Sequence, residues 1–273
     1  MHTGIIPRAE CAIIGGSGTY SLNFPEELSW PGLELKASGL IFETPFGPSP
    51  PLKFFMLNGR HVLTVKMHGW RKGVSRSSAS RQLFWVFKEA GVKAVFSEGG
   101  VGAVNRLLKP KDIVIPDDYL DFSMRKDCDL GDDFLLIMRQ PVCPRIKKIL
   151  VKTAQNRTKG RVFDCGVYAV TDGRHFESPA EVRMLYQLGA DIVGQSMCPE
   201  VYLAREIGAC YGRLDVVVNY AEGVVREWDY DEFVDIFYNY SATIGSILLD
   251  AVCEHNYDPG CGCSQLRKDT LLK

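Results

Sequence analysis

The stretch Ala12-Ile13-Ile14-Gly15-Gly16-Ser17-Gly18 joins a short apolar run directly to a glycine-rich turn. The apolar run predicts a buried strand, and the glycines let backbone N–H groups approach an oxyanion closely. Ser17 adds a hydroxyl that can rotate toward a ligand. Tight strand exits use the same residues for conformational reasons alone, so both interpretations stay open for this turn. A strand that ends in such a turn is a common beginning of an anion site in an α/β fold.

The rest of the chain alternates β-branched runs with helical patterns. Strands are predicted at 12–14, 61–65, 94–97, 112–116, 166–171, 191–193 and 214–219. Helices are predicted at 77–90, 143–155, 179–188, 199–207 and 231–253. Pro179 and Pro199 each stand at a first helical position, where proline is favoured. The alternation predicts an α/β fold, with a mixed, mainly parallel, twisted sheet and helices on both faces.

Length and composition favour one domain over residues 1–273. A chain of 273 residues with 46% hydrophobic content can bury about three quarters of its unfolded surface in a single core. We expect this core at 10–255, followed by a polar tail at 256–273. The charged segment 117–141 has few periodic apolar residues, which predicts a long surface excursion or a subunit-contact loop.

Charge and hydropathy exclude several classes of protein. The formal net charge is −1 and no cluster of five basic residues occurs, so nucleic acid is not an expected partner. No apolar run approaches the roughly 20 residues of a membrane span. The segment Met1–Glu10 lacks the apolar core of a signal peptide. We therefore expect a cytoplasmic protein without a membrane partner.

Nine cysteines raise the question of disulfides and metals. Seven are scattered along the chain, several of them inside apolar stretches, as buried thiols usually are. Cys261 and Cys263 differ, because they form Cys261-Gly262-Cys263 in the polar tail. They could stay reduced, close a small strained disulfide, or pair with other cysteines. Zinc would need two more ligands, and no second Cys/His pair has suitable spacing, so no metal site is predicted.

Polar residues unusual for a core stand at three predicted strand ends, where open α/β sheets bind ligands. They are Ser17, the segment Thr171–Glu177, and Asn219 after an all-valine run. An asparagine amide can accept and donate at the edge of a planar heterocycle. Phe176 offers a ring for stacking, and Glu177 a carboxylate that accepts from ring N–H groups. Alternatively, Glu177 caps the helix at Pro179 and Asn219 merely ends a strand.

A set of motifs in a fixed order makes a resemblance specific. The motifs are Gly15-Gly16-Ser17-Gly18, Glu43-Thr44-Pro45-Phe46-Gly47, Met67-His68-Gly69, Pro110–Ile115, Phe176-Glu177, Ser196 with Pro199-Glu200, and Asn219. In this order the chain resembles the family of 5′-methylthioadenosine phosphorylases and purine nucleoside phosphorylases, from about residue 11 to about residue 253. The resemblance implies a homotrimer or a dimer of trimers. It also implies cleavage of a purine nucleoside by inorganic phosphate as co-substrate, without a cofactor or a metal.

The base pocket implied by the resemblance is of the 6-oxopurine type. Methylthioadenosine phosphorylases carry aspartates where this chain has Asn219 and Ala221. Asn219 and Glu177 instead resemble the pair that 6-oxopurine enzymes direct at hypoxanthine or guanine. In this role Asn219 holds N7 and O6, and Glu177 holds N1–H. An adenine would leave the amide donor unpaired, which costs about 1–3 kcal/mol.

The residues expected to bind phosphate depart from the family pattern. By resemblance, Ser17, His68 and Ser196 contact phosphate, and the N–H groups of Gly99 and Gly100 can cradle an oxyanion. Met67 replaces an arginine, however, and neither methionine nor glycine supplies a bidentate partner for a dianion. Further residues are assigned to the same site: Phe176 to the base, Gln195 and Glu98 to the ribose, and Arg71, Lys72 or Arg76 to compensate for the missing charge.

The function implied is phosphorolysis in purine salvage, of inosine, guanosine or 5′-methylthioinosine. Two alternatives remain: a hydrolase in which Glu98 or His68 activates water, and a purine-binding paralogue without catalysis. The family supplies part of the 5′ wall from a neighbouring subunit, which corresponds here to 135–140. The apolar residues in 135–140 favour a hydrophobic 5′ group on the nucleoside. Alternatively, they are ordinary packing at a subunit interface.

Overall fold

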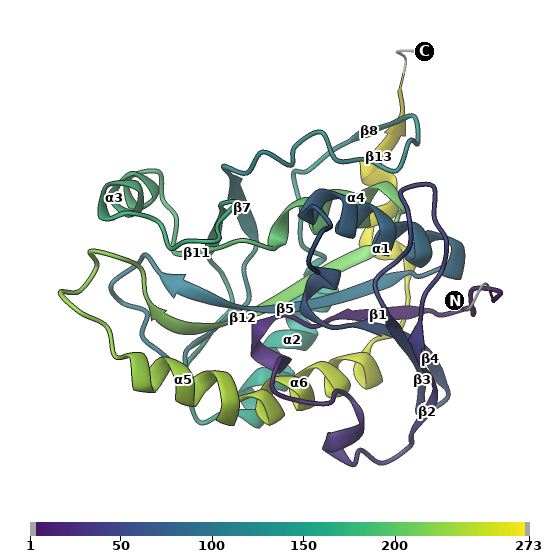
Figure 1. Ribbon diagram of the computed structural model, residues 1–273, viewed down its shortest axis with the longest axis horizontal. Coiled ribbons are helices and arrows are strands. Elements are labelled where there is room, and N and C mark those ends of the chain that lie inside the picture. The colour runs from purple at the N-terminus through teal and green to yellow at the C-terminus, as the bar shows by residue number, and fades with distance from the viewer. Residues whose placement is uncertain (1–3, 271–273) are drawn as a thin grey trace.

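The structure is a computed structural model in which residues 4–270 are described (Figure 1). The ends of the predicted domain, 1–3 and 271–273, lie outside these residues, as do the first three residues of the Met1–Glu10 segment. One eleven-stranded sheet forms the centre, with the order β2-β3-β4-β1-β5-β11-β10-β7, and β12, β6 and β9 branch from β5. The strands are β1 Cys11–Ile14, β2 Leu33–Leu40, β3 Leu52–Leu57, β4 Arg60–Val65, β5 Ala94–Ala103, β6 Ile113–Val114, β7 Asp118–Asp121, β9 Val162–Phe163, β10 Val167–Val170, β11 Ile192–Gly194 and β12 Cys210–Tyr220.

The sheet is mixed and mainly parallel. Strands β4, β1, β5 and β12 run parallel, as do β7, β10 and β11. The antiparallel pairings are β5–β11, β6–β12 and the β2–β3–β4 meander. The predicted α/β fold with a mixed, mainly parallel sheet is confirmed.

Helices cover both faces of this sheet, as predicted (Figure 1). On one face α1 (Arg76–Ala90) packs against α4 (Met197–Glu206), and on the other α2 (Pro144–Arg157) packs against α6 (Ser241–Glu254). Strand β1 contributes side chains to the cores on both faces of the sheet. Ala12 and Ile14 enter the core beneath α1 and α4, whereas Cys11 and Ile13 enter the core beneath α2 and α6. This is the period of two expected of a strand buried on both faces.

The shorter helix α3 (Pro179–Gln187) begins at the predicted proline. Its N-cap is Ser178, whose side chain accepts from the Glu181 backbone in a capping box. Glu177 therefore does not cap this helix. The predicted start of α4 at Pro199 is nearly right: α4 begins at Met197, but Cys198 has non-helical angles (φ −101°, ψ 138°), so the regular turns start at Pro199.

The predicted helix 231–253 is wrong as a single element. It consists of α5 (Tyr230–Asn239) and α6, which meet at Tyr240 with a bend of 44°. At the bend the Ser241 hydroxyl donates to the Phe237 carbonyl at 3.0 Å, a back-bond that bends helices. Among residues 4–270 no single helix is long and apolar enough to cross a membrane, and α5 with α6 reaches that criterion only as this bent pair.

The excursion 117–141 contains structure that the prediction missed. It begins with the sheet strand β7 and includes β8 (Phe134–Leu136), which pairs antiparallel with β13 (Arg267–Asp269). The tail after residue 255 is thus attached to the domain, and Cys263 is buried in the core beneath α2 and α6.

Candidate active site

The candidate site lies where β5 changes its neighbour. The first half of β5 pairs with β1 up to Ser97, and its end pairs with β11 from Gly102. Between these positions the edge of β5 faces the glycine-rich turn after β1. Such a switch in strand pairing opens a crevice in α/β sheets.

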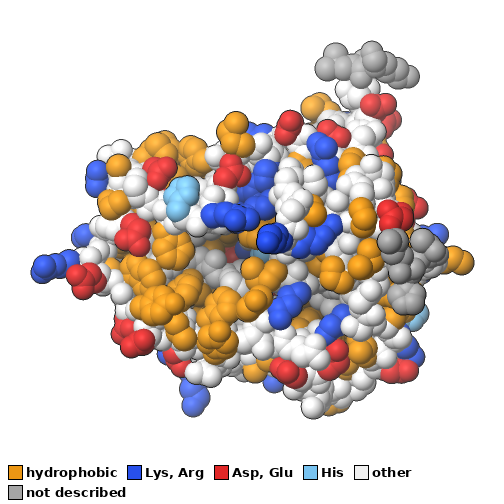
Figure 2. Space-filling view, viewed as in Figure 1, with side chains coloured by type: hydrophobic (Ala, Val, Ile, Leu, Met, Phe, Trp, Pro, Cys, Tyr) orange, Lys and Arg blue, Asp and Glu red, His pale blue; other side chains and the backbone are white. Residues whose placement is uncertain are grey.

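A cavity of about 200 Å³ occupies this crevice. Figure 2 shows a hollow on this face, with hydrophobic side chains gathered on the side of α5 and Lys and Arg side chains on the opposite side. Nine of the predicted site residues line the cavity: Ser17, His68, Gly99, Gly100, Phe176, Glu177, Gln195, Ser196 and Asn219. They come from six separate segments of the chain, so their convergence is a property of the fold.

Asn219 and Glu177 line this cavity together, with 4% and 8% of their surfaces exposed. The Asn219 amide donates one N–H to the Tyr220 carbonyl at 2.8 Å, which fixes its orientation. Its second N–H and its carbonyl can still bond a ligand. Glu177 accepts from the Thr171 hydroxyl at 2.5 Å. The two side chains offer a donor, an acceptor and a carboxylate to one occupant.

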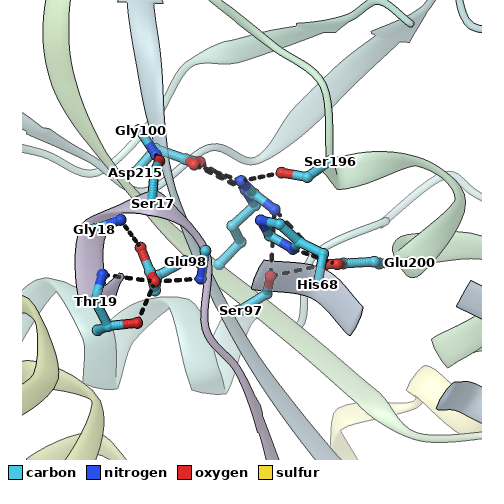
Figure 3. A network of polar contacts seen from close by, with 12 residues as sticks. Ser17, Gly18, Thr19, His68, Ser97, Glu98, Gly100, Ser196, Glu200 and Asp215 are labelled. Carbon is cyan, nitrogen blue, oxygen red and sulfur yellow. Dashed lines mark hydrogen bonds and ion pairs between the residues drawn. The ribbon is translucent and has the colours of Figure 1, made fainter. Parts of the chain in front are cut away.

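On the opposite side, the Ser17 turn is held against β5. The Gly100 N–H donates to Ser17 Oγ at 2.7 Å, so the Ser17 hydroxyl hydrogen can point to an anion. The packing requires glycine here, because a Cβ on Gly100 would lie 2.7 Å from Ser17 Oγ. A Cβ on Gly16 would lie 2.6 Å from His68 Nε2. The glycines thus permit a close approach of three segments (Figure 3).

The prediction that Glu98 binds ribose or activates water is wrong. Its carboxylate is fully buried and does not line the cavity. It accepts from the backbone N–H groups of Gly16, Gly18 (2.9 Å) and Thr19 (3.0 Å), and from the Thr19 hydroxyl at 2.7 Å (Figure 3). A short helical turn leaves such N–H groups without partners, and a carboxylate satisfies several at once. Glu98 is a structural residue of the turn.

His68 is oriented by Glu200 on α4. The Nδ1 atom donates to Glu200 Oε1 at 2.7 Å, and both side chains are buried. Glu200 also accepts from Ser97 Oγ at 2.7 Å and Tyr211 OH at 3.1 Å. Burial alone would raise the pKa of Glu200, but the charge and hydrogen bond of His68 outweigh it and lower the pKa. Glu200 therefore stays ionised and holds the His68 ring in this orientation at the cavity.

Backbone strain surrounds His68. Met67 and His68 have φ values of 50° and 54°, and Gly69 follows with 72°. Left-handed angles in residues other than glycine cost on the order of 1–3 kcal/mol each and gather at functional sites. Here they direct the side chains of both Met67 and His68 to the cavity.

The sequence interpretation missed a fully buried ion pair below Ser196. Arg213 Nη2 lies 2.7 Å from Asp215 Oδ1, and the same nitrogen donates to Ser196 Oγ at 2.8 Å. The Ser196 hydroxyl hydrogen is consequently available to a ligand. Burial raises the pKa of Asp215 to about 6 even though Arg213 opposes this shift. The pair could have been predicted from the sequence, because Arg213 and Asp215 are two charged residues in a mostly apolar strand, β12.

Arg76 is the predicted compensating cation that reaches the cavity lining. Its Nη1 donates to Gln195 Oε1 at 2.9 Å, and its guanidinium lies 3.9 Å from the Trp70 ring centroid. Burial, and then the charge of Arg125, lower the pKa of Arg76. Arg71 instead donates to the Gly69 and Pro48 carbonyls, and Lys72 is exposed.

Aromatic residues form the remaining wall. Phe176 meets Trp228 edge to face at 5.9 Å and is 50% exposed, so it lies at the rim of the cavity. Phe233 and Phe237 line the cavity from α5. Residues 135–140 do not line the cavity of their own chain, and their contribution to a neighbouring subunit stays a prediction.

Comparison with known proteins gives the family. The model of the phosphorylase superfamily matches residues 10–253. The chain is 32% identical to the probable 6-oxopurine nucleoside phosphorylase of Moorella thermoacetica, over 93% of this chain and 96% of that protein. It is 32% identical to the probable S-methyl-5′-thioinosine phosphorylase of Methanothermobacter thermautotrophicus, over 92% and 86%.

Solved structures agree on the fold. A methylthioadenosine phosphorylase from an antarctic soil metagenomic library has a TM-score of 0.75 at 28% identity, covering 90% of this chain and 86% of that one. The Schistosoma mansoni methylthioadenosine phosphorylase in complex with tubercidin has a TM-score of 0.79 at 22% identity, covering 97% and 100%, which supports the fold alone. The expected resemblance is confirmed: this chain belongs to the phosphorylase superfamily, among the purine nucleoside and methylthioadenosine phosphorylases.

Proposed function

We propose that this protein is a purine nucleoside phosphorylase that acts on 6-oxopurine nucleosides. The observation that carries the proposal is the shared cavity, with Asn219 and Glu177 on one side and Ser17, His68 and Ser196 on the other. The first side suits the edge of a purine, and the second suits an oxyanion. The sugar of a nucleoside would lie between them.

The base preference follows from the buried polar groups. The Asn219 amide can donate to O6 or N7, and the Glu177 carboxylate accepts N1–H, which a 6-oxopurine carries and adenine lacks. Ala221, at the position of an aspartate in adenine-cleaving relatives, also lines the cavity. Relatives named as 6-oxopurine nucleoside phosphorylases include one from Pyrococcus furiosus, 30% identical over 94% of this chain.

Inorganic phosphate is the proposed co-substrate, with no further cofactor. The hydroxyls of Ser17 and Ser196 and the Gly99 N–H group donate to it, with His68 on the same side of the cavity. The Gly100 N–H group, also expected to bind phosphate, instead donates to Ser17 Oγ. As the bond from C1′ to the base nitrogen breaks, the electron pair leaves with the purine, where Asn219 stabilises it. A phosphate oxygen then bonds to C1′. The protein contributes positioning and fixed charges.

The 5′ group faces the least polar wall. Phe233 and Phe237 support an apolar substituent such as the methylthio group of methylthioinosine. We also propose a homotrimer or dimer of trimers, on the family resemblance, and a role in purine salvage, on the proposed reaction. The cytoplasmic location expected from the sequence stays a prediction.

The test is a panel of inosine, guanosine, adenosine, methylthioadenosine and methylthioinosine, each incubated with and without phosphate. We expect free base and ribose 1-phosphate, or its methylthio analogue, from the 6-oxopurine nucleosides and only when phosphate is present. Equal turnover without phosphate would indicate hydrolysis. Thermal stabilisation by hypoxanthine without cleavage of any nucleoside would indicate a binding protein, and both results would contradict the proposal.

A further inference from the structure

Four cysteines meet on the α2 side of the sheet, outside the candidate active site. They are Cys143 at the N-cap of α2, Cys210 at the start of β12, and Cys261 and Cys263 from the tail. Their sulfur atoms all lie within 4.8 Å of one another. Three of the residues are buried and Cys261 is half-buried. The sequence interpretation found no metal site, because the second pair of ligands is far from Cys261 and Cys263 along the chain.

The spacing of the sulfurs suits a single metal ion. With a Zn–S bond of about 2.3 Å, the sulfurs of a tetrahedral site lie about 3.8 Å apart. The Cys210 and Cys261 sulfurs are 3.4 Å apart, and the others fall within the same small volume. Four thiolates in a closed, tetrahedral set are typical of structural zinc.

Positively polarised groups lie beside the cluster. Cys143 is the N-cap of α2, at the end of the helix dipole that favours negative charge. Buried Arg205 donates to the Cys263 carbonyl at 2.7 Å and brings a positive charge close to the cluster. More than one thiolate in so small a volume requires a cation between them.

We propose that Cys143, Cys210, Cys261 and Cys263 bind one zinc ion that fixes the C-terminal tail to the layer of α2 and β12. Binding replaces the remaining thiol protons with four Zn–S bonds, releases those protons to solvent and changes no oxidation state. The tail continues from this site into β13, which pairs with β8. Zinc would therefore strengthen the attachment that the β8–β13 pairing and the burial of Cys263 provide.

The direct test is the metal content of the full-length protein, purified under reducing conditions without chelators. Elemental analysis should find about one zinc per chain. Cys261→Ser and Cys263→Ser should lose this zinc, and Cys165→Ser, which alters an exposed cysteine outside the cluster, should retain it. Circular dichroism reports whether each variant is folded. Cys261→Ser should be the better tolerated of the two, because Cys261 is half-buried whereas Cys263 is buried.

Cobalt gives a second, spectroscopic readout of the same site. Exchange of the metal for Co²⁺ should produce the intense visible bands of tetrahedral cobalt thiolate, and these bands should be absent in Cys263→Ser. Removal of the metal with a chelator should lower Tm by several degrees in the natural sequence and leave Tm unchanged in Cys263→Ser.

A thiol count separates zinc from disulfides. After denaturation with a chelator, all nine cysteines should react with a thiol reagent. A protein without zinc in which only seven or five of the nine react would have one or two disulfides, and the proposal would be wrong. Nine reactive thiols with no uptake of added zinc or cobalt would also overturn it.

Discussion

The two ends of the cavity are built differently. At the anion end, Ser17, His68 and Ser196 are backed by buried carboxylates and a buried guanidinium, and each is held by hydrogen bonds to another segment. At the aromatic end, the rings of Phe176, half-exposed at the rim, and of Phe237 on the short helix α5 pack against other rings. The first end has fixed donors, and the second offers shape and apolar surface.

This difference indicates a division of labour. Electrostatic stabilisation of a reacting anion requires donors whose positions are set in advance. Discrimination between 5′ substituents requires only a fitting apolar surface, where each methylene is worth about 1–3 kcal/mol. Substitutions at the anion end should therefore affect folding or chemistry, and those at the aromatic end should affect substrate preference.

The largest expected effect is on stability at the anion end. Arg213→Met removes the partner of fully buried Asp215 and should lower the free energy of unfolding by about 3–5 kcal/mol. Urea denaturation measures the loss. The matched control is Arg183→Met on the exposed face of α3, expected within about 0.5 kcal/mol of the natural sequence. Equal urea midpoints for the two variants would show that the ion pair does not stabilise the anion end.

The next effect is on the chemistry at the base. Asn219→Ala should lower kcat for inosine by about 100- to 1000-fold, the usual loss when a donor to developing charge is removed. Stability should change by no more than about 1.5 kcal/mol, because the Asn219 side chain makes one hydrogen bond inside the protein. Asn239→Ala, on the exposed side of α5, is the control. Unchanged kinetics in Asn219→Ala would contradict the assignment of the base pocket.

A smaller effect is expected on phosphate. Ser196→Ala removes one hydroxyl donor to a charged ligand and should raise the KM for phosphate by about tenfold or more. The KM for inosine should stay nearly constant, because Ser196 lies at the anion end of the cavity, opposite the base. Steady-state kinetics at varied phosphate measure the change, with Ser38→Ala on the exposed strand β2 as control. A rise in the KM for inosine alone would place the anion elsewhere.

The smallest effect belongs to the aromatic end. Phe237→Ala should reduce kcat/KM for methylthioinosine by about tenfold, consistent with the loss of apolar contact worth about 1–2 kcal/mol. Inosine, whose 5′ hydroxyl gains little from this ring, should lose less. Competition between the two nucleosides measures the ratio directly. If both lose equally, Phe237 supports the fold of α5 and not the 5′ group.

Much of this site could be predicted from sequence because its signals are local. Ser17 follows a strand in a glycine-rich turn, and Asn219 ends an apolar strand. Glu98 could not be placed in this way, since only the fold shows that its side chain turns to the N–H groups after β1 and away from the cavity.

The interactions that the sequence could not predict join distant segments. Arg213 and Asp215 are two residues apart and share one face of β12, but their partner Ser196 comes from another strand end. Cys143 and Cys263 meet only because the tail folds back on α2. The break at Tyr240 was missed because the apolar pattern continues through it, and a serine back-bond decides the bend.

The central claim is that the Asn219 amide recognises the oxygen of a 6-oxopurine. The most direct test is the ratio of kcat/KM for inosine to that for adenosine, measured with phosphate for the natural sequence and for Asn219→Asp. We predict a strong preference for inosine that falls by about tenfold or more in Asn219→Asp, since a carboxylate accepts from the 6-amino group and repels O6. A natural sequence that prefers adenosine, or a ratio that Asn219→Asp leaves unchanged, would contradict the account.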